Sequence, residues 1–390
     1  MGARPRAQLA LAIAAGVGTL FGVQGISAAL PVLERELGVS ESELGLFTAV
    51  YMLPAVLFAV PLGYAADRLG RRRVFVSMVV LYSLAGAAQA WTTDFGVILG
   101  LRFLQGVGFG GLMPLTVTLI GDAYRGATQL RAQAHRQVAM GIGEFVMPLL
   151  GAALAAVSWQ TALLAQGGLL PIALAGALLL DDTRSRTETG GYARELAIAA
   201  RQPGLPAVFA GGFLRFVCKF ALIAYLPLML VGDRGATLAQ GALVLGVASG
   251  VAAAVNFAVV RLLVQVPASR LLIGATALVG AAVVGFALAP TWEVALVVAV
   301  VFGIGDGVLV VVQNSLVTEA APDRIRAGVV AVSGMTRNAG KLAAPLAMGA
   351  LILVASVPVS FAVVGAATLA AVPALRPLRR LDHLLGRERV

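Results

Sequence analysis

Two residue types that build many active sites are scarce in this sequence of 390 residues. It contains one cysteine, Cys218, and two histidines, His135 and His383. A single thiol cannot close a disulfide within the chain, and no Cys/His cluster is available to bind a metal ion. The G-x-x-x-x-G-K-[ST] loop that binds nucleotide phosphates is also absent. We therefore expect no metal, no other cofactor and no step driven by ATP hydrolysis.

Charged residues are scarce as well, at 12% of the chain against 59% hydrophobic residues. A soluble protein of this length cannot bury so much apolar surface, so a lipid bilayer is the expected solvent. A membrane-spanning helix needs about 20 largely apolar residues. The sequence contains twelve such runs, at approximately 9–30, 44–66, 74–91, 95–120, 137–157, 159–180, 206–231, 238–260, 271–289, 292–317, 329–354 and 357–375.

The first apolar run, Leu9–Leu30, has no cleavage site of small residues after it. We therefore expect this run to be a retained helix and not a signal peptide.

The basic residues are distributed unevenly along the chain, which has a net charge of +10. If the N-terminus is cytoplasmic, 22 of the 29 Lys and Arg residues fall in inner loops and tails, and only Arg35 and Arg234 fall in outer loops. Basic residues concentrate on the cytoplasmic side of membrane proteins. This asymmetry predicts a multi-pass protein of the plasma (inner) membrane with both termini cytoplasmic, and it explains the basic charge through anionic headgroups rather than nucleic acid.

The longest polar connection, 181–204, separates six apolar runs from six others. The sequence therefore predicts an all-α membrane protein with twelve transmembrane helices in two six-helix halves, 1–180 and 205–375. The connection is expected to be a cytoplasmic linker. The basic tail at 376–390 is expected either to lie against anionic headgroups or to be solvated. We expect the protein to be a monomer.

Three motifs resemble those of the major facilitator superfamily, and in particular its drug:proton antiporter branch of multidrug efflux proteins. Residues 63–73, Gly-Tyr-Ala-Ala-Asp-Arg-Leu-Gly-Arg-Arg-Arg, resemble the loop signature G-x-x-x-D-R-x-G-R-R-R. Residues 101–108, Leu-Arg-Phe-Leu-Gln-Gly-Val-Gly, resemble the R-x-x-Q-G-x-G helix. Residues 143–152 resemble the antiporter signature G-x-x-x-G-P-x-x-G-G, with Met147 and Ala152 at two of the expected glycines.

The resemblance implies the major facilitator fold and an alternating-access cycle, with substrate held between the halves. It implies that Asp67 contacts the start of the eleventh helix and latches the cytoplasmic side. The residues expected to take part in gating are Gly63, Asp67, Arg68, Gly70, Arg71 and Arg337. The corresponding loop of the second half, 261–270, has lost the acidic residue and the glycines.

Five basic residues lie inside the expected helices: Arg102, Arg215, Lys219, Arg337 and Lys341. A charge inside a membrane costs several kcal/mol unless it is paired or hydrated. The resemblance implies a role for Arg102 in proton coupling through its positive field, and the alternative is a structural arginine bonded to backbone carbonyls. Arg337 lies close enough to the inner face to be structural or gating, and the role of Lys341 stays open.

Two carboxyl groups, Glu144 and Asp306, also lie inside the expected helices. In a low-dielectric site such groups can exchange protons near neutral pH, or they can form salt bridges with the buried cations. Arg215 and Lys219 are four residues apart and share one helix face. Their mutual repulsion requires compensation by Asp306, by an aqueous cavity or by a bound anion.

The surplus of three positive charges inside the membrane favours a substrate with a carboxylate or phosphate group over a strongly cationic drug. The leading hypothesis is a secondary active transporter that couples export of a small amphipathic or anionic compound to the proton gradient. One alternative is proton-coupled uptake of an organic anion, and another is a lipid-translocating transporter of the same fold. A membrane enzyme or sensor would require a catalytic cluster or an output domain, and the sequence contains neither. The partners expected are thus a small-molecule substrate and the lipid bilayer.

Overall fold

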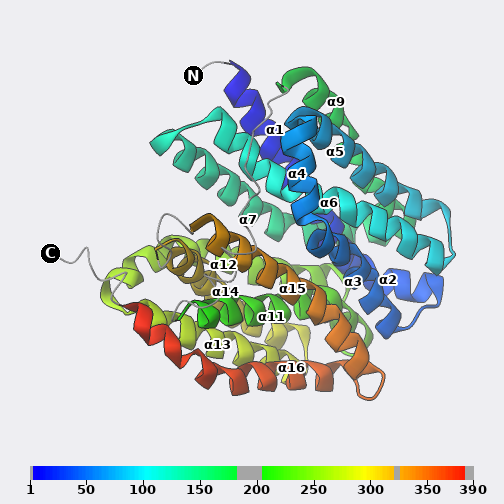
Figure 1. Cartoon of the computed structure of the whole chain (residues 1–390). Helices are drawn as coiled ribbons and strands as arrows, with labels where there is room; N and C mark the ends of the chain where they lie inside the picture. The colour runs from blue at the N-terminus through cyan, green and yellow to red at the C-terminus, as the bar shows by residue number, and fades with distance from the viewer. Residues whose placement is uncertain (1–2, 182–203, 320–325, 383–390) are drawn as a thin grey trace. The chain divides into compact units, whose positions relative to one another are not determined.

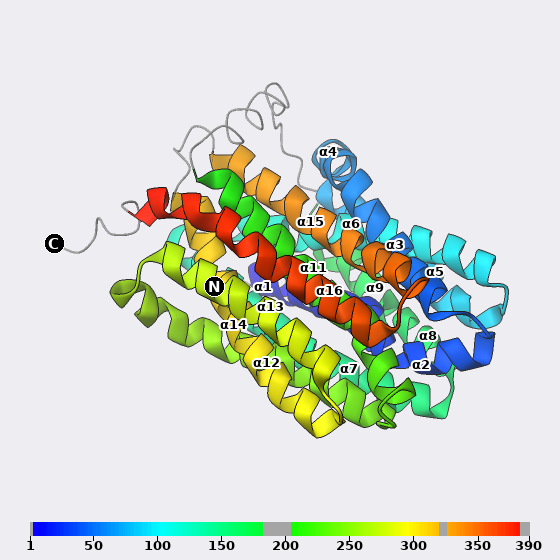
Figure 2. The same ribbon diagram turned by 90° about the horizontal axis from the view of Figure 1, so that it is seen from below.

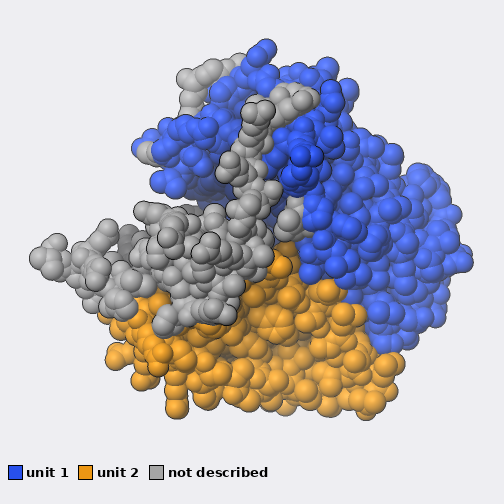
Figure 3. All heavy atoms as spheres, in the orientation of Figure 1, with its two compact units in different colours: residues 1–188, 237–246 blue, residues 189–236, 247–390 orange. Residues whose placement is uncertain are grey.

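The computed structural model describes residues 3–181, 204–319 and 326–382 (Figure 1). Every regular element in these ranges is a helix, as the apolar runs predict. The chain divides into two compact units, residues 1–188 with 237–246, and residues 189–236 with 247–390 (Figure 3). The expected linker at 181–204 and the end of the expected basic tail lie almost entirely outside the described residues.

The first unit contains helices joined by short turns. They are α1 (Ala3–Leu20), η1 (Phe21–Gly25), α2 (Ile26–Leu37), α3 (Glu41–Leu57), α4 (Ala59–Leu69), α5 (Arg71–Ala88), η2 (Gln89–Trp91), α6 (Phe95–Ala123), α7 (Gly126–Val157), α8 (Trp159–Leu164), η3 (Ala165–Leu169) and α9 (Leu170–Leu179). In Figure 2 these elements run from dark blue to green. α1, η1 and α2 form one continuous span in which η1 is a single π-helical turn.

The second unit repeats the all-helical arrangement. It contains α11 (Leu205–Gly232), α12 (Leu238–Gln265, whose first turns belong to the first unit), α13 (Ala268–Leu288), α14 (Trp292–Glu319), α15 (Arg326–Ile352), α16 (Val357–Ala371) and η4 (Val372–Leu381). In the described residues, ten helices are long and apolar enough to cross a membrane, and a bent pair forms an eleventh. α15, which has 27 residues and contains Arg337 and Lys341, completes the expected twelve.

The second expected span, 44–66, is bent. α3 and α4 meet at Phe58, and the helix axes bend there by 56°. Pro61 lacks the N–H that would bond to Leu57 one turn earlier, and Phe58 adopts φ −108° and ψ 2°, outside the α-helical region. The bend therefore follows from a proline placed just after it.

The charged hinge expected at 63–73 is almost entirely helical. α4 continues to Leu69 and α5 begins at Arg71, so that Gly70 alone lies between them. Gly70 has φ +99°, a conformation that residues with a side chain rarely adopt. The expectation of a loop was wrong because apolar-run analysis ends a helix at its first charged residues, whereas the helical backbone of α4 continues through Asp67 and Arg68 to Leu69.

The end of the chain packs against the second unit. In η4, Leu375, Leu378 and Leu381 recur every third residue and are buried, which matches the three-residue turn of a 3₁₀ helix. The carboxylate of Asp382 then accepts hydrogen bonds from the N–H (2.9 Å) and the hydroxyl (2.6 Å) of Ser269, at the start of α13. This part of the expected tail is therefore anchored to the protein.

Glycines allow helices to pack with their backbones in contact. A Cβ atom at Gly106 of α6 would overlap the carbonyl oxygen of Tyr51 in α3. In the second unit, a Cβ at Gly303 or Gly307 of α14 would lie 2.5 or 2.6 Å from carbonyl oxygens of α12. Small residues at such crossings are the usual means of close packing between membrane helices.

Replacing Gly106 with alanine is expected to lower the thermal stability of the purified protein, because the new methyl group overlaps the α3 backbone. Gly100→Ala on the same helix is the matched control, since a Cβ there meets nothing within 4 Å. The control is expected to be neutral or slightly stabilising, because alanine favours a helix over glycine by about 1 kcal/mol. Equal unfolding temperatures for the two variants in detergent would contradict the proposed packing constraint.

Candidate functional site

The second unit brings three of the predicted site residues into one buried cluster. Asp306, on α14, is 2% exposed and accepts hydrogen bonds from Nε of Arg215 at 2.5 Å and from Nη2 at 3.2 Å. Nζ of Lys219 lies 3.5 Å from Oδ2 of Asp306, the oxygen that Nη2 of Arg215 also contacts. The shared helix face predicted for Arg215 and Lys219 on α11 therefore exists, and Asp306 compensates their repulsion, which was one of the possibilities left open.

The glycines around Asp306 determine where its side chain points. Gly303 and Gly307 pack against α12, and Gly305 packs against Val279 of α13. These contacts hold the faces of α14 on either side of Asp306 close to neighbouring helices. The carboxylate is thereby directed to α11, where Arg215 and Lys219 lie.

An aromatic residue joins a further cation to this cluster. The ring of Phe216 lies 4.7 Å from the guanidinium carbon of Arg215 and 5.1 Å from Nζ of Lys341 on α15. Such cation–π contacts are worth about 2 kcal/mol or more when they are desolvated. Arg337, the other predicted cation of α15, contacts the side-chain oxygen of Asn314 on α14 at 3.4 Å. We call Arg215, Lys219, Asp306, Phe216 and Lys341 the second-unit cluster.

The first unit holds Arg102 in a different environment. Its Nη1 donates to Gln105 (2.8 Å) and its Nη2 donates to the carbonyl of Gly22 in the π-helical turn (2.7 Å). The rings of Phe47 and Tyr51 lie within 4.2 and 4.5 Å of the guanidinium carbon. No carboxylate contacts Arg102 among the residues that the structure describes, so the contacts favour the structural alternative over direct coupling to a nearby carboxyl.

Three glutamines extend the polar contacts of Arg102, namely Gln105 of the R-x-x-Q-G-x-G motif and two that were not singled out from the sequence, Gln89 and Gln166. Gln105 accepts from Gln89 at 3.0 Å and donates to Gln166, which in turn donates to the carbonyl of Gly86 at 3.2 Å. All three are completely buried. Their signal in the sequence was the presence of an amide inside an otherwise apolar run, since a buried amide requires partners.

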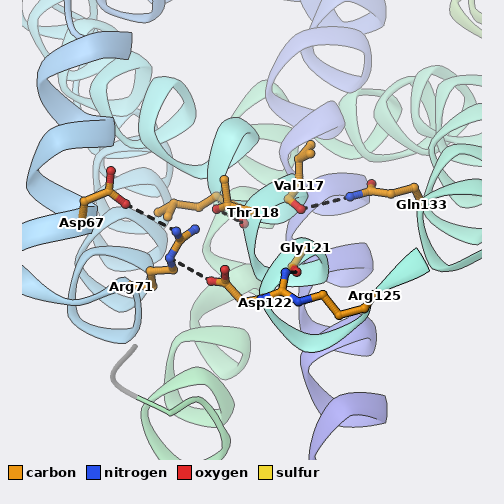
Figure 4. A network of polar contacts seen from close by, with 9 residues as sticks. Asp67, Arg71, Val117, Thr118, Gly121, Asp122, Arg125 and Gln133 are labelled. Atoms are coloured by element: carbon orange, nitrogen blue, oxygen red, sulfur yellow. Dashed lines mark hydrogen bonds and ion pairs between the residues drawn. The ribbon is translucent and has the colours of Figure 1, made fainter. Parts of the chain in front are cut away.

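A second charge network connects α4, α5 and α6 (Figure 4). Arg71 lies between two carboxylates, with Nη2 at 3.4 Å from Asp67 and Nε at 2.8 Å from Asp122. Arg71 is 8% exposed, so this ion pair is shielded from water. The network includes two of the predicted gating residues, and the sequence reasoning missed Asp122 because it lies at the end of an apolar run.

The remaining predicted residues of the first unit form none of these ion pairs. Gly63 lines a small pocket together with Asp67, Arg71 and residues of α6. Arg68 contacts the ring of Tyr64 at 4.7 Å. Glu144 is half-buried on α7. Glu144 and Asp306, the two predicted carboxylates, therefore belong to different units.

Two arginines that were counted among the inner-loop charges are buried. One is Arg71 of the α4–α5–α6 network. The other is Arg136, which lies within α7 and is 8% exposed. The expected helix at 137–157 begins eleven residues earlier, at Gly126, and thereby includes Arg136. The count of five cations inside the protein was therefore too low.

An all-helical pair of units with buried ionic clusters defines a polytopic membrane transporter. The chain belongs to the Major Facilitator Superfamily, whose family model matches residues 12–340 and 208–388. Solved structures of the same fold include a POT family transporter in complex with 5-aminolevulinic acid, at a TM-score of 0.83 and 12% identity over 96% of each chain. Another is a bacterial homologue of the human lysosomal transporter Spinster, at a TM-score of 0.76 and 16% identity over 99% of this chain and 97% of that one. The expected major facilitator fold is thus confirmed.

Curated relatives match parts of the chain. The bacillibactin exporter of Bacillus subtilis is 30% identical over 137 residues, 33% of this chain and 34% of that protein. The 4-hydroxybenzoate transporter of Pseudomonas aeruginosa is 33% identical over 157 residues, 38% and 33% of the two chains. The 3-(3-hydroxy-phenyl)propionate transporter of Escherichia coli is 32% identical over 216 residues, 51% of each chain. The chain thus matches about a third to a half of the length of these relatives.

Replacing Arg71 with glutamine is expected to reduce transport strongly, because it removes the cation that lies between the carboxylates of Asp67 and Asp122. Arg72→Gln is the matched control, since Arg72 is exposed on the next position of α5. Adding Asp122→Asn to Arg71→Gln is expected to restore part of the activity. The measurement is substrate uptake into vesicles reconstituted with each variant. Parental transport activity in the Arg71→Gln variant would contradict the prediction.

Proposed function

We propose that the protein is a secondary active transporter of a small organic anion, with an aromatic monocarboxylate as the preferred class. The observation that carries this proposal is the second-unit cluster, which holds three cations and one carboxylate. By residue count, the cations of the cluster outnumber its carboxylate by three to one. These cations would attract an anionic group, and the ring of Phe216 offers an apolar surface beside the charges.

The relatives support the same class of substrate. The names of two of them specify 4-hydroxybenzoate and 3-(3-hydroxy-phenyl)propionate, and a further relative is the niacin transporter of Acinetobacter baylyi, 34% identical over 93 residues. Each of these compounds is a carboxylic acid attached to an aromatic ring. Their names state no direction of transport, and we propose uptake as the first candidate.

Export is the second candidate and is favoured by a specific relative, the bacillibactin exporter. Both directions share the proposed driving force, the proton gradient, and both require a carboxyl group that is protonated alternately from the two sides. We assign this role to Asp306, with Glu144 as the second candidate. In either case we propose that both termini are cytoplasmic and that the α4–α5–α6 network belongs to the cytoplasmic gate.

The direction and the coupling are tested with the purified protein in proteoliposomes, with radiolabelled benzoate and a pH gradient of either sign. Uptake by proton symport is expected to be accelerated when the outside is acidic. Acceleration by an acidic interior identifies export by antiport. A benzoate flux that no pH gradient changes would overturn proton coupling in both directions.

The Arg215→Gln/Lys219→Gln double variant is expected to weaken transport of benzoate much more than transport of neutral benzamide. Loss of one charged hydrogen bond is worth about 1.5–3 kcal/mol, which is more than tenfold in affinity. The matched control is Arg234→Gln, a cation of the predicted outer side that contacts the carbonyl of Ala287. Unchanged benzoate transport by the double variant would remove the anion proposal.

Replacing Asp306 with asparagine is expected to abolish the response to the pH gradient while benzoate exchange across the membrane, with benzoate on both sides, persists. Exchange requires a binding site and a conformational change but no net proton movement. The measurement is the ratio of gradient-driven uptake to exchange, relative to the parent protein. A variant that keeps the parental ratio would show that Asp306 is not the coupling group.

A further inference from the structure

Arg136 is a buried charge of the first unit, and the proposed mechanism does not use it. The sequence analysis placed this residue in a loop. It lies on the face of α7 that also carries Ala132 and Met140, which are 3% and 7% exposed. The opposite face carries Val138 and Ile142, which are 43% and 61% exposed. Arg136 therefore points into the helical bundle and away from the lipid-facing side of α7.

The environment of Arg136 holds its side chain in one position. Nε donates to the hydroxyl of Thr116 on α6 at 3.0 Å, and this hydroxyl in turn donates to the carbonyl of Met113. A Cβ atom at Gly16 of α1 would lie 3.9 Å from both Nε and Nη2. The guanidinium therefore lies close to α1 as well as to α6.

The charge of Arg136 has no carboxylate partner among the residues that the structure describes. The bond to Thr116 uses one of the five N–H donors of the guanidinium, and the donors on the two terminal nitrogens remain. The residue keeps a small accessible surface, at 8% exposed. A buried cation with unbonded N–H donors is an arrangement that can bind an oxyanion.

We infer that Arg136 and Thr116 form a second anion subsite, in the first unit, for the carboxylate of the transported compound. The inference rests on the proposed function, since it takes the cargo to be an organic anion. It adds a binding site that is separate from the second-unit cluster. The orientation of Arg136 into the bundle favours the carboxylate of a cargo over the phosphate of a lipid headgroup.

The test compares three variants in proteoliposomes: Arg136→Gln, Arg136→Lys and Arg131→Gln. Arg136→Gln is expected to raise the KM for benzoate about tenfold or more, with a smaller effect on kcat and none on benzamide transport. Arg136→Lys keeps the charge and is expected to recover most of the affinity. Arg131, exposed on the same helix, is the matched control and is expected to have no effect.

Two results of this experiment would overturn the inference while leaving the proposed function intact. The first is that the Arg136→Gln variant keeps the KM of the parent protein for benzoate while the Arg215→Gln/Lys219→Gln variant has lost benzoate transport. The other is an effect of Arg136→Gln that disappears in vesicles of phosphatidylcholine alone, which would identify a headgroup contact with anionic lipid.

A second measurement does not depend on the cargo and decides the question if the parent protein transports no benzoate. Gln133, half-buried one turn before Arg136, is replaced by cysteine in a Cys218→Ser background. The rates of modification by an anionic and a cationic methanethiosulfonate are compared with and without Arg136→Gln. An accessible cation at Arg136 is expected to raise the anionic-to-cationic ratio by about threefold or more. An equal ratio in the two backgrounds would overturn the subsite.

Discussion

The cost of placing charge inside a membrane is the constraint on which the interior of this protein depends. Asp306 is tolerated because two cations of α11 lie within 3.5 Å of its carboxylate. Both cations in turn are tolerated because Asp306 faces them, and the ring of Phe216 also faces Arg215. Removing Asp306 would leave two cations of α11 without their shared carboxylate in a low-dielectric site. The cluster is therefore a unit, and a ligand or proton that changes its charge changes the balance of the whole group.

Close helix packing supplies the geometry that this electrostatic balance requires. The glycines of α14 bring its backbone against α12 and α13, and this fixes the direction in which Asp306 points. In the first unit, Gly106 has the same effect between α6 and α3, so that Arg102 reaches Gly22 and the rings of Phe47 and Tyr51. Close packing of the helix backbones at these glycines brings side chains of different helices near enough to form hydrogen bonds of about 3 Å.

The sequence predicted the helices well, since the length of an apolar run depends only on the thickness of the bilayer. It also predicted that Arg215 and Lys219 share a helix face and gave Asp306 as one of three possible sources of compensation, and the structure pairs both cations with Asp306. The sequence-based prediction failed where a helix continues through polar residues, because hydropathy assigns such a stretch to a loop. Arg136 lies in a polar stretch that hydropathy assigns to a loop, although its spacing of four from Ala132 and Met140 is helical. The pairing of Arg71 with Asp122 depends on a tertiary contact between α5 and α6, which the sequence alone does not display.

The π-helical turn at Phe21–Gly25 has a consequence for the evolution of the chain. A turn that bonds over five residues contains one residue more than an α-helical turn, and each residue of an α-helix rotates the following face by about 100°. A one-residue deletion here would convert the turn to an α-helix and rotate α2 relative to α1 without shortening the span below what a bilayer requires. Alignments of descendants of this chain can therefore contain a gap inside their first membrane helix, at a position where gaps are normally treated as errors.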